Sequence, residues 1–130
     1  MNYVTDTHSI VWYFTENSSL SERALEVFEK TVKENGEIII IPSIVLAEIM
    51  FIATKGKITL TFEETLQKID SYDNFIVAVL DVEILKVADR IKADLEMHDK
   101  LIAATALYHN AFLITKDPMI TDSEVCTIIW

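Results

Sequence analysis

Cysteine, glycine and proline are scarce in this sequence. Cys126 is the only cysteine among 130 residues, so an internal disulfide is excluded. Two glycines and two prolines stand against a hydrophobic content of 51%, so the chain is neither disordered nor built of many tight turns. The length is that of one ordinary domain, and we predict a single domain spanning residues 1–130.

Basic residues are also in the minority. Eleven Lys and Arg face 21 Asp and Glu, which gives a net charge of −10. This balance argues against a protein that binds nucleic acid through an overall basic surface. It does not exclude a nuclease, because clustered carboxylates attract phosphate once divalent cations lie among them.

Long apolar runs are missing. The longest, Ile38–Ile41 and Phe75–Leu80, are far shorter than the roughly 20 residues that cross a bilayer. The first residues, Met1–Asp6, lack the basic start and apolar stretch of a signal peptide. We therefore expect a soluble, cytoplasmic protein without a membrane segment.

Predicted strands alternate with predicted helices along the chain. Ile38–Ile41 and Phe75–Leu80 are apolar without polar alternation, which is typical of strands buried on both faces of a parallel sheet. Further strands are expected at Met1–Thr5, Ala111–Thr115 and, at an edge, Thr127–Trp130. The alternation predicts an α/β fold with a central, mainly parallel sheet.

Helices are predicted between these strands. Capping-box spacing marks two helix starts, one at Ser19 with Glu22 and one at Thr61 with Glu64. The first of these helices should end at Asn35-Gly36. The other helices are expected at residues 44–54, along a stripe formed by Leu85, Ala88, Ile91 and Leu95, and within residues 101–108.

Two acidic residues follow predicted strands. Asp6 comes directly after Met1–Thr5, and Asp117 comes two residues after the strand that ends at Thr115. In parallel sheets the ligand site lies beyond the carboxyl ends of the strands. Each residue also has a structural explanation, since Asp6 suits a helix N-cap and Asp117 an Asp-Pro turn.

Glu48 is the most informative acid. It lies in the strongly apolar segment Ile44–Ile52, which predicts a helix buried on every side. An ionised carboxylate is costly to bury without a partner, and no basic residue follows nearby before Lys55. A bound cation would satisfy this carboxylate.

Asp99 completes a set of four carboxylates. It precedes a run of small residues that predicts a helix packed closely on the sheet, although an acid in a first helical turn is also favoured by the helix dipole. Oxygen ligands without His or Cys suit Mg²⁺ or Mn²⁺. Without a cation the four carboxylates would repel one another, and some of their pKa values would rise.

These segments resemble the PIN-domain family, and within it the VapC-type toxins of prokaryotic toxin–antitoxin pairs. The resemblance covers essentially the whole chain and rests on four short motifs in order: Tyr3–His8, Pro42–Ile49, Asp99–Ala106 and Leu113–Asp117. It implies a three-layer α/β/α fold with a five-stranded parallel sheet, usually in a homodimer. Lys100 and Lys116 stand where relatives often carry Arg, which keeps the charge but loses the bidentate geometry.

The implied activity is Mg²⁺- or Mn²⁺-dependent cleavage of RNA, held in check by a bound antitoxin. Asp6, Glu48, Asp99 and Asp117 would hold one or two ions that activate a water for attack on phosphorus. The resemblance also implies products with a 5′-phosphate and a 3′-hydroxyl. As a further hypothesis, Thr115 would hydrogen-bond the attacking water or a ligand.

Other functions remain open. In a phosphoacceptor receiver domain, Asp81 would be phosphorylated and Lys116 would be the conserved lysine, but Asp6 lacks an adjacent second acid. A haloacid-dehalogenase-type phosphatase would need a second Asp where His8 stands. A catalytically silent PIN-fold interaction protein is the third alternative, and it should bind no Mn²⁺.

Overall fold

A five-stranded sheet forms the centre of the protein. The computed structural model describes residues 1–34 and 36–130. The strands are β1 (Asn2–Thr5), β2 (Ile38–Pro42), β3 (Phe75–Ala78), β4 (Phe112–Ile114) and β5 (Ile128–Ile129). They lie in the order β3-β2-β1-β4-β5, and every neighbouring pair is parallel.

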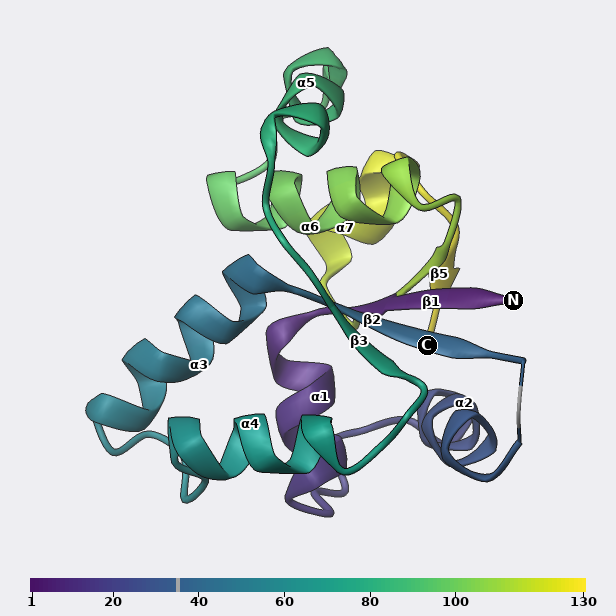
Figure 1. The fold of residues 1–130 in the computed structure, drawn as a ribbon. Coiled ribbons are helices and arrows are strands. Elements are labelled where there is room, and N and C mark those ends of the chain that lie inside the picture. Colours follow the sequence, from purple (N-terminus) through teal and green to yellow (C-terminus); the bar gives the residue numbers. More distant parts are fainter. Residues whose placement is uncertain (35) are drawn as a thin grey trace.

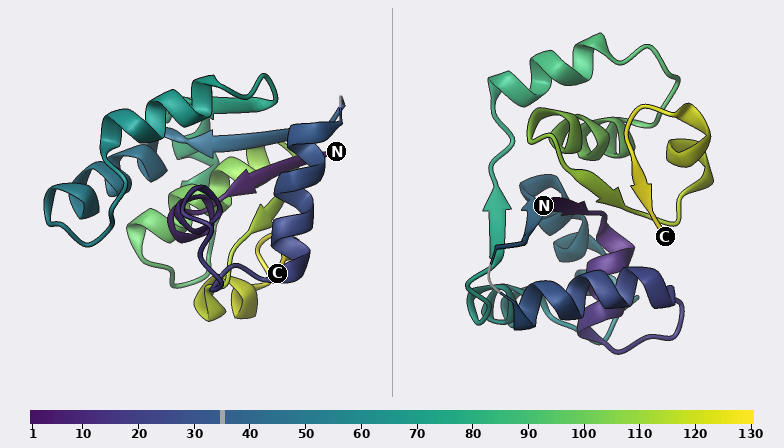
Figure 2. Two further views of the ribbon diagram at one scale, coloured as in Figure 1. Left: turned by 90° about the horizontal axis from the view of Figure 1, so that it is seen from below. Right: turned by 90° about the vertical axis from the view of Figure 1, so that its right-hand side faces the viewer.

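Helices cover both faces of this sheet, as Figures 1 and 2 show. One side carries α1 (Thr7–Phe14), α2 (Glu22–Lys33), α3 (Ser43–Thr54) and α4 (Phe62–Asp70). The other side carries α5 (Val82–Arg90), α6 (Met97–Tyr108) and α7 (Pro118–Ser123). The predicted three-layer α/β/α fold is confirmed, with a parallel sheet throughout.

The core lies around β1 and α6. Val4 is fully buried in the central strand, and the segment Leu101–Ala106 of α6 is buried along its whole length. The alanines of this segment let the helix backbone approach the sheet closely, as the sequence predicted. Burying a side chain such as Ile102 stabilises the fold by roughly 1.5–3 kcal/mol.

Two helix boundaries differ from the sequence prediction. Helix α2 begins at Glu22 because Ser21, rather than Ser19, is its N-cap and accepts a hydrogen bond from the backbone of Ala24. Its predicted end at Asn35-Gly36 falls partly outside the described residues, and α2 itself ends at Lys33. The capping box of Thr61 and Glu64 at the start of α4 is confirmed.

Helix α5 is shorter than its predicted apolar stripe. It ends at Arg90, so Ile91 and Leu95 are buried from the connection to α6. Leu85, which was expected in the stripe, is exposed, and Ile84 is buried in its place. The helix packs on α6 and projects away from the sheet (Figure 1).

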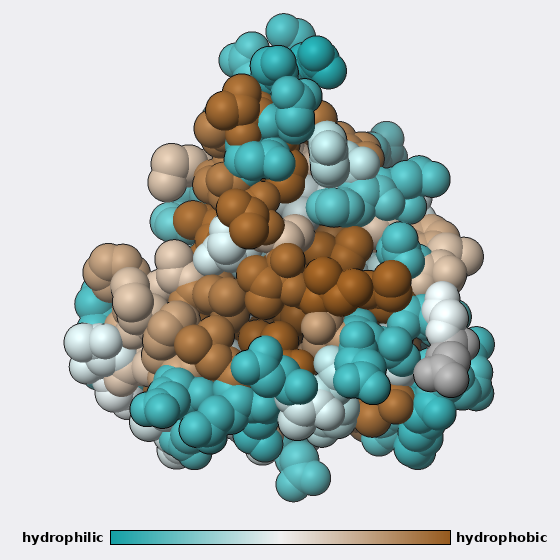
Figure 3. Space-filling view, in the orientation of Figure 1, coloured by the Kyte–Doolittle hydropathy of each residue, from teal (hydrophilic) through white to brown (hydrophobic). Residues whose placement is uncertain are grey.

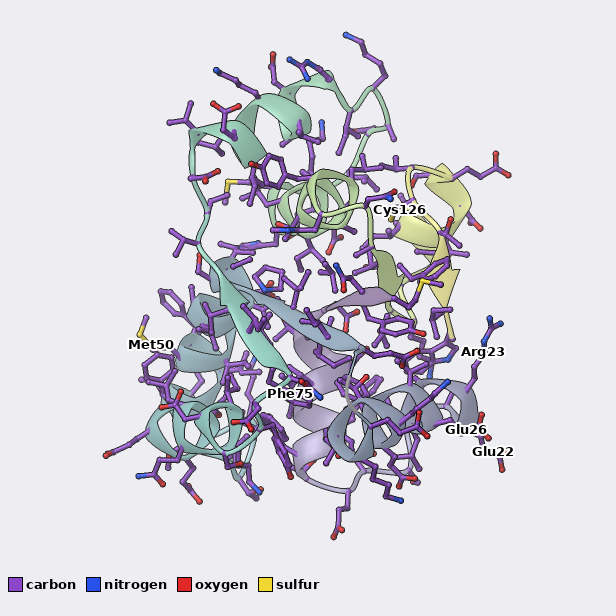
Figure 4. All side chains as sticks on the ribbon, turned by 45° about the vertical axis from the view of Figure 1, so that its right-hand side comes forward. Glu22, Arg23, Glu26, Met50, Phe75 and Cys126 are labelled. Atoms are coloured by element: carbon purple, nitrogen blue, oxygen red, sulfur yellow. The ribbon has the colours of Figure 1, made fainter. Side chains whose placement is uncertain are left out.

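The prediction that α3 is buried on every side is wrong. Only Val45 and Ile49 are buried, whereas Met50 and Phe51 are 43% and 61% exposed. Figure 4 shows Met50 on the outside of this helix. The apolar residues of α3 therefore belong partly to the protein surface, and the cost of burying Glu48 is smaller than the sequence indicated.

The prediction that Phe75–Leu80 is a buried strand is also wrong. Strand β3 pairs only with β2, so it is an edge strand, and Ile76 and Val77 are exposed. Phe75 is buried and lies within the body of the protein (Figure 4). Apolar side chains gather in a continuous band where β3 lies nearest the viewer (Figure 3). We call this band, with the start of α5, the β3–α5 surface: Ile76, Val77, Val79, Val82 and Leu85.

None of the helices in the described part of the chain is long and apolar enough to cross a membrane.

Candidate active site

Asp6 lies at the carboxyl end of the central strand. It is the N-cap of α1, and its Oδ1 accepts a hydrogen bond of 2.9 Å from the backbone N–H of Ser9. The Thr115 hydroxyl donates to Oδ2 at 2.5 Å. Both carboxylate oxygens of Asp6 are thus held in place, and the structural role of an N-cap coexists with a position in the site.

Thr115 connects two of the acids. Besides donating to Asp6, its hydroxyl oxygen accepts a 3.0 Å hydrogen bond from the backbone N–H of Asp117. Thr115 is fully buried. Its hydroxyl is therefore engaged within the protein, and it positions Asp6 relative to Asp117.

Asp117 caps the short helix that follows β4. Its Oδ1 accepts a hydrogen bond of 2.8 Å from the backbone N–H of Met119. Asp99 reaches the same place from the first turn of α6, and Glu48 from the second turn of α3. All four predicted acids line one cavity of about 530 Å³.

The electrostatics of this cavity follow from burial and from like charges. Burial, followed by the carboxylates of Asp117, Glu96 and Glu48, raises the pKa of Asp99 to about 6. Burial also raises the pKa of Asp6, although the hydrogen bonds from Ser9 and Thr115 and the nearby His8 act in the opposite direction. The cavity therefore disfavours full ionisation of its own carboxyl groups.

The chemistry of these ligands fits a hard divalent cation. Carboxylate oxygens are the ligands that Mg²⁺ and Mn²⁺ prefer, and a cation would relieve the repulsion that raises the pKa of Asp99. In residues 1–34 and 36–130, no group of three or more His, Cys, Asp or Glu side chains already has the arrangement of a metal-ligand set. The four acids line the same cavity, but their carboxylate oxygens do not converge on one common position.

Comparison with known proteins identifies the family. Residues 3–123 match the PIN domain. The chain belongs to the PIN domain family. No match was found among curated proteins.

Solved structures with the same fold come from several bacteria. The VapBC2 structure from Rickettsia felis, bound to a DNA fragment from the promoter, has 20% identity and a TM-score of 0.72, covering 98% of this chain and 97% of that one. DNA-bound VapBC from Salmonella typhimurium has 20% identity and a TM-score of 0.69, with 98% and 96% covered. VapBC-5 from Mycobacterium tuberculosis, described as a member of a family of toxin–antitoxin systems, has 16% identity and a TM-score of 0.63, with 98% and 97% covered. At these identities the likeness establishes the fold that this PIN domain shares with them.

Sequence reasoning missed several residues that line the cavity of this PIN domain. Glu96 is the N-cap of α6 and lies three residues before Asp99, so a second acid beside the start of this helix could have revealed it. His98 lines the cavity too, and its Nδ1 lies 3.0 Å from Oε1 of Glu96, which raises the pKa of the imidazole. Trp12 and His8 line the same cavity.

Proposed function

We propose that this PIN domain is a divalent-metal-dependent endoribonuclease, the toxin component of a toxin–antitoxin pair. The observation that carries the proposal is the convergence of four carboxylates on one cavity at the carboxyl edge of the sheet. These residues come from four separate elements, so no local structural need explains their meeting. The family match and the toxin–antitoxin structures of similar fold support the same function.

Asp6, Glu48, Asp99 and Asp117 would hold Mg²⁺ or Mn²⁺. A cation bound there would supply Lewis-acid activation of a water and neutralise charge on the phosphate of RNA. The protein's own contribution is positional. Thr115 and the backbone of Ser9 fix the Asp6 carboxylate, and Asp117 is fixed by Met119 and by Thr115.

The test is cleavage of single-stranded RNA by the purified protein with Mn²⁺, Mg²⁺ or EDTA. We expect cleavage that requires the cation and is lost in Asp6→Asn and Asp117→Asn. Calorimetric titration with Mn²⁺ should show binding to the wild type. A folded wild-type protein that neither binds Mn²⁺ nor cleaves RNA would be a silent interaction protein, and the proposal would be wrong.

The proposed partners are a cognate antitoxin and a second copy of this chain. Co-expression with the product of the adjacent open reading frame should relieve the toxicity of the chain expressed alone. For the homodimer, the support is the β3–α5 surface, where exposed apolar side chains adjoin an edge strand. Contiguous exposed apolar patches of this kind mark protein interfaces.

A further inference from the structure

Trp12 separates the acidic cavity from a second cavity. The second cavity has a volume of about 490 Å³, and both His8 and Trp12 line it as well as the first. Its size is within the roughly 300–1,000 Å³ of ligand pockets in proteins. The two cavities are therefore neighbouring compartments that share an aromatic wall.

The indole of Trp12 is held by its neighbours. His8 lies one turn earlier on the same face of α1, with ring centroids 5.6 Å apart. Trp130 packs from the other end of the chain at 6.0 Å, and Nζ of Lys116 lies 5.9 Å from the centre of the Trp12 ring. Trp12 remains partly exposed, so it combines a fixed orientation with an accessible aromatic surface.

The second cavity differs from the first in charge. Its lining contains no Asp or Glu, whereas five acidic residues line the first cavity. Lys57 contributes a positive charge, and Asn17 and Thr59 contribute polar groups. In a protein with a net charge of −10, this cavity can accept a phosphate group without repulsion from an acidic side chain of its own lining.

Single-stranded nucleic acid is recognised by this combination of groups. Bases stack on aromatic side chains, and basic side chains follow the backbone. We propose that the second cavity is a subsite for a nucleotide that flanks the scissile phosphate of single-stranded RNA, with its base stacked on Trp12 and its phosphate facing Lys57. This inference rests on the proposed function, because it places the flanking nucleotide relative to the acidic cavity.

The first experiment measures stacking directly. The chain has two tryptophans, so Trp130→Phe leaves Trp12 as the only indole reporter. A mixed-sequence single-stranded oligoribonucleotide of 12 nucleotides, added with Mn²⁺, should quench this fluorescence. The same oligoribonucleotide with abasic sugars should quench it much less, because a phosphate backbone alone cannot stack.

The second experiment separates binding from chemistry. Trp12→Ala should raise KM for the 12-nucleotide RNA by about 5- to 150-fold, the range expected for loss of one stacked base, with a smaller change in kcat. Trp12→Phe, which keeps an aromatic ring, should recover most of this loss. Lys57→Gln should raise KM and reduce its salt dependence, whereas Lys92→Gln, at an exposed position that lines neither cavity, should change neither.

Circular dichroism and Mn²⁺ calorimetry show whether each variant is folded and binds the cation. If Trp12→Ala is unfolded, the fluorescence of the Trp130→Phe protein and the KM of Lys57→Gln still decide the question. A wild type that cleaves RNA while Trp12 fluorescence is unchanged and KM is insensitive to Trp12→Ala and Lys57→Gln overturns the subsite alone. A wild type that neither cleaves nor binds RNA overturns the proposed function and the subsite with it.

Discussion

Two regions of the sheet, the carboxyl ends of β1 and β4 and the outer edge at β3, differ in what they present to solvent. Around β1 and β4, carboxylates from several elements meet in one cavity, and hydrogen bonds within the chain hold two of them in place. At the β3 edge, apolar side chains are exposed, and no element of the described chain pairs with the outer side of the strand. The first region is assembled within one chain, whereas the second is an exposed apolar surface for which we propose a partner.

The largest effect should come from the acidic region. Asp6→Asn should reduce metal-dependent RNA cleavage by more than the roughly 10–100-fold that loss of a group supporting a metal ligand costs. Asn is as good an N-cap as Asp, so the fold should be kept. Cleavage assays with Mn²⁺ and thermal unfolding without it check both parts. Asp81→Asn, which changes the N-cap of α5 away from the cavity, is the matched control. Wild-type turnover in Asp6→Asn would remove this residue from the site.

A substitution at the β3 edge should change the oligomeric state of the protein and not its metal binding. Ile76→Glu places a charge in the β3–α5 surface. Burying this charge against a second chain would be costly. We expect light scattering with size exclusion to show a pair of chains for the wild type and one chain for the variant. Mn²⁺ binding should change little. Leu107→Glu, at another exposed apolar position, should remain a pair. A wild type that is a monomer at all concentrations would assign this surface to another partner.

The sequence predicted the sheet, and it singled out the four acids of the proposed site, because both leave local signals. An apolar run marks a strand, and an acid just after it marks the carboxyl end of that strand, as with Asp6 and Asp117. The same signal cannot distinguish a central strand from an edge strand, because Ile38–Ile41 and Phe75–Leu80 are equally apolar. Exposure of Ile76 and Phe51 depends on which elements pack nearby, and that is decided by tertiary structure.

Glu48 illustrates the same limit at the site. The apolar residues around it predicted burial and hence a need for a cation, but Met50 and Phe51 are exposed. Its place in the site rests on the cavity that it shares with Asp6, Asp99 and Asp117. Trp12 was missed because its place at the cavity depends on long-range proximity, whereas Glu96 lies close to Asp99 in the sequence and could have been found.

Thr115 should link stability to metal binding. Thr115→Val removes the donor to Asp6 and leaves the backbone N–H of Asp117 without that acceptor. Losing a buried hydrogen bond in this way should destabilise the protein by about 1–3 kcal/mol in chemical denaturation. Mn²⁺ affinity should fall by about 10–100-fold, and Thr115→Ser should restore most of both. Unchanged Mn²⁺ affinity in a destabilised Thr115→Val would restrict this residue to folding.

The smallest effect is a pH dependence that sharpens the contrast between the two regions. The folded protein raises the pKa of Asp99 to about 6 from an ordinary value of 3.8, through burial and the nearby Asp117, Glu96 and Glu48. A raised carboxyl pKa means that the folded state binds more protons than the unfolded state between these values. The contribution of Asp99 to stability is therefore present below about pH 4 and lost as the pH rises through about 6. His98, whose pKa is raised mainly by its hydrogen bond to Glu96, changes stability in the same direction.

Denaturation without metal should accordingly show stability that decreases between pH 4 and pH 7, by a small amount because Asp99 is partly exposed and its interactions are screened by solvent. Asp99→Asn should remove the part due to Asp99, and His98→Gln only the part due to the imidazole. The raised pKa of Asp6 leaves a remaining dependence of the same sign. Mn²⁺ should stabilise the wild type more at pH 7.5 than at pH 5, because the cation competes with protons for the same carboxylates. Ile76→Glu should leave the dependence of the acidic cavity unchanged, since this substitution lies at the β3 edge. Equal stabilisation by Mn²⁺ at both pH values would mean that the cation binds away from Asp99, and the cavity would then lose its role as the metal site.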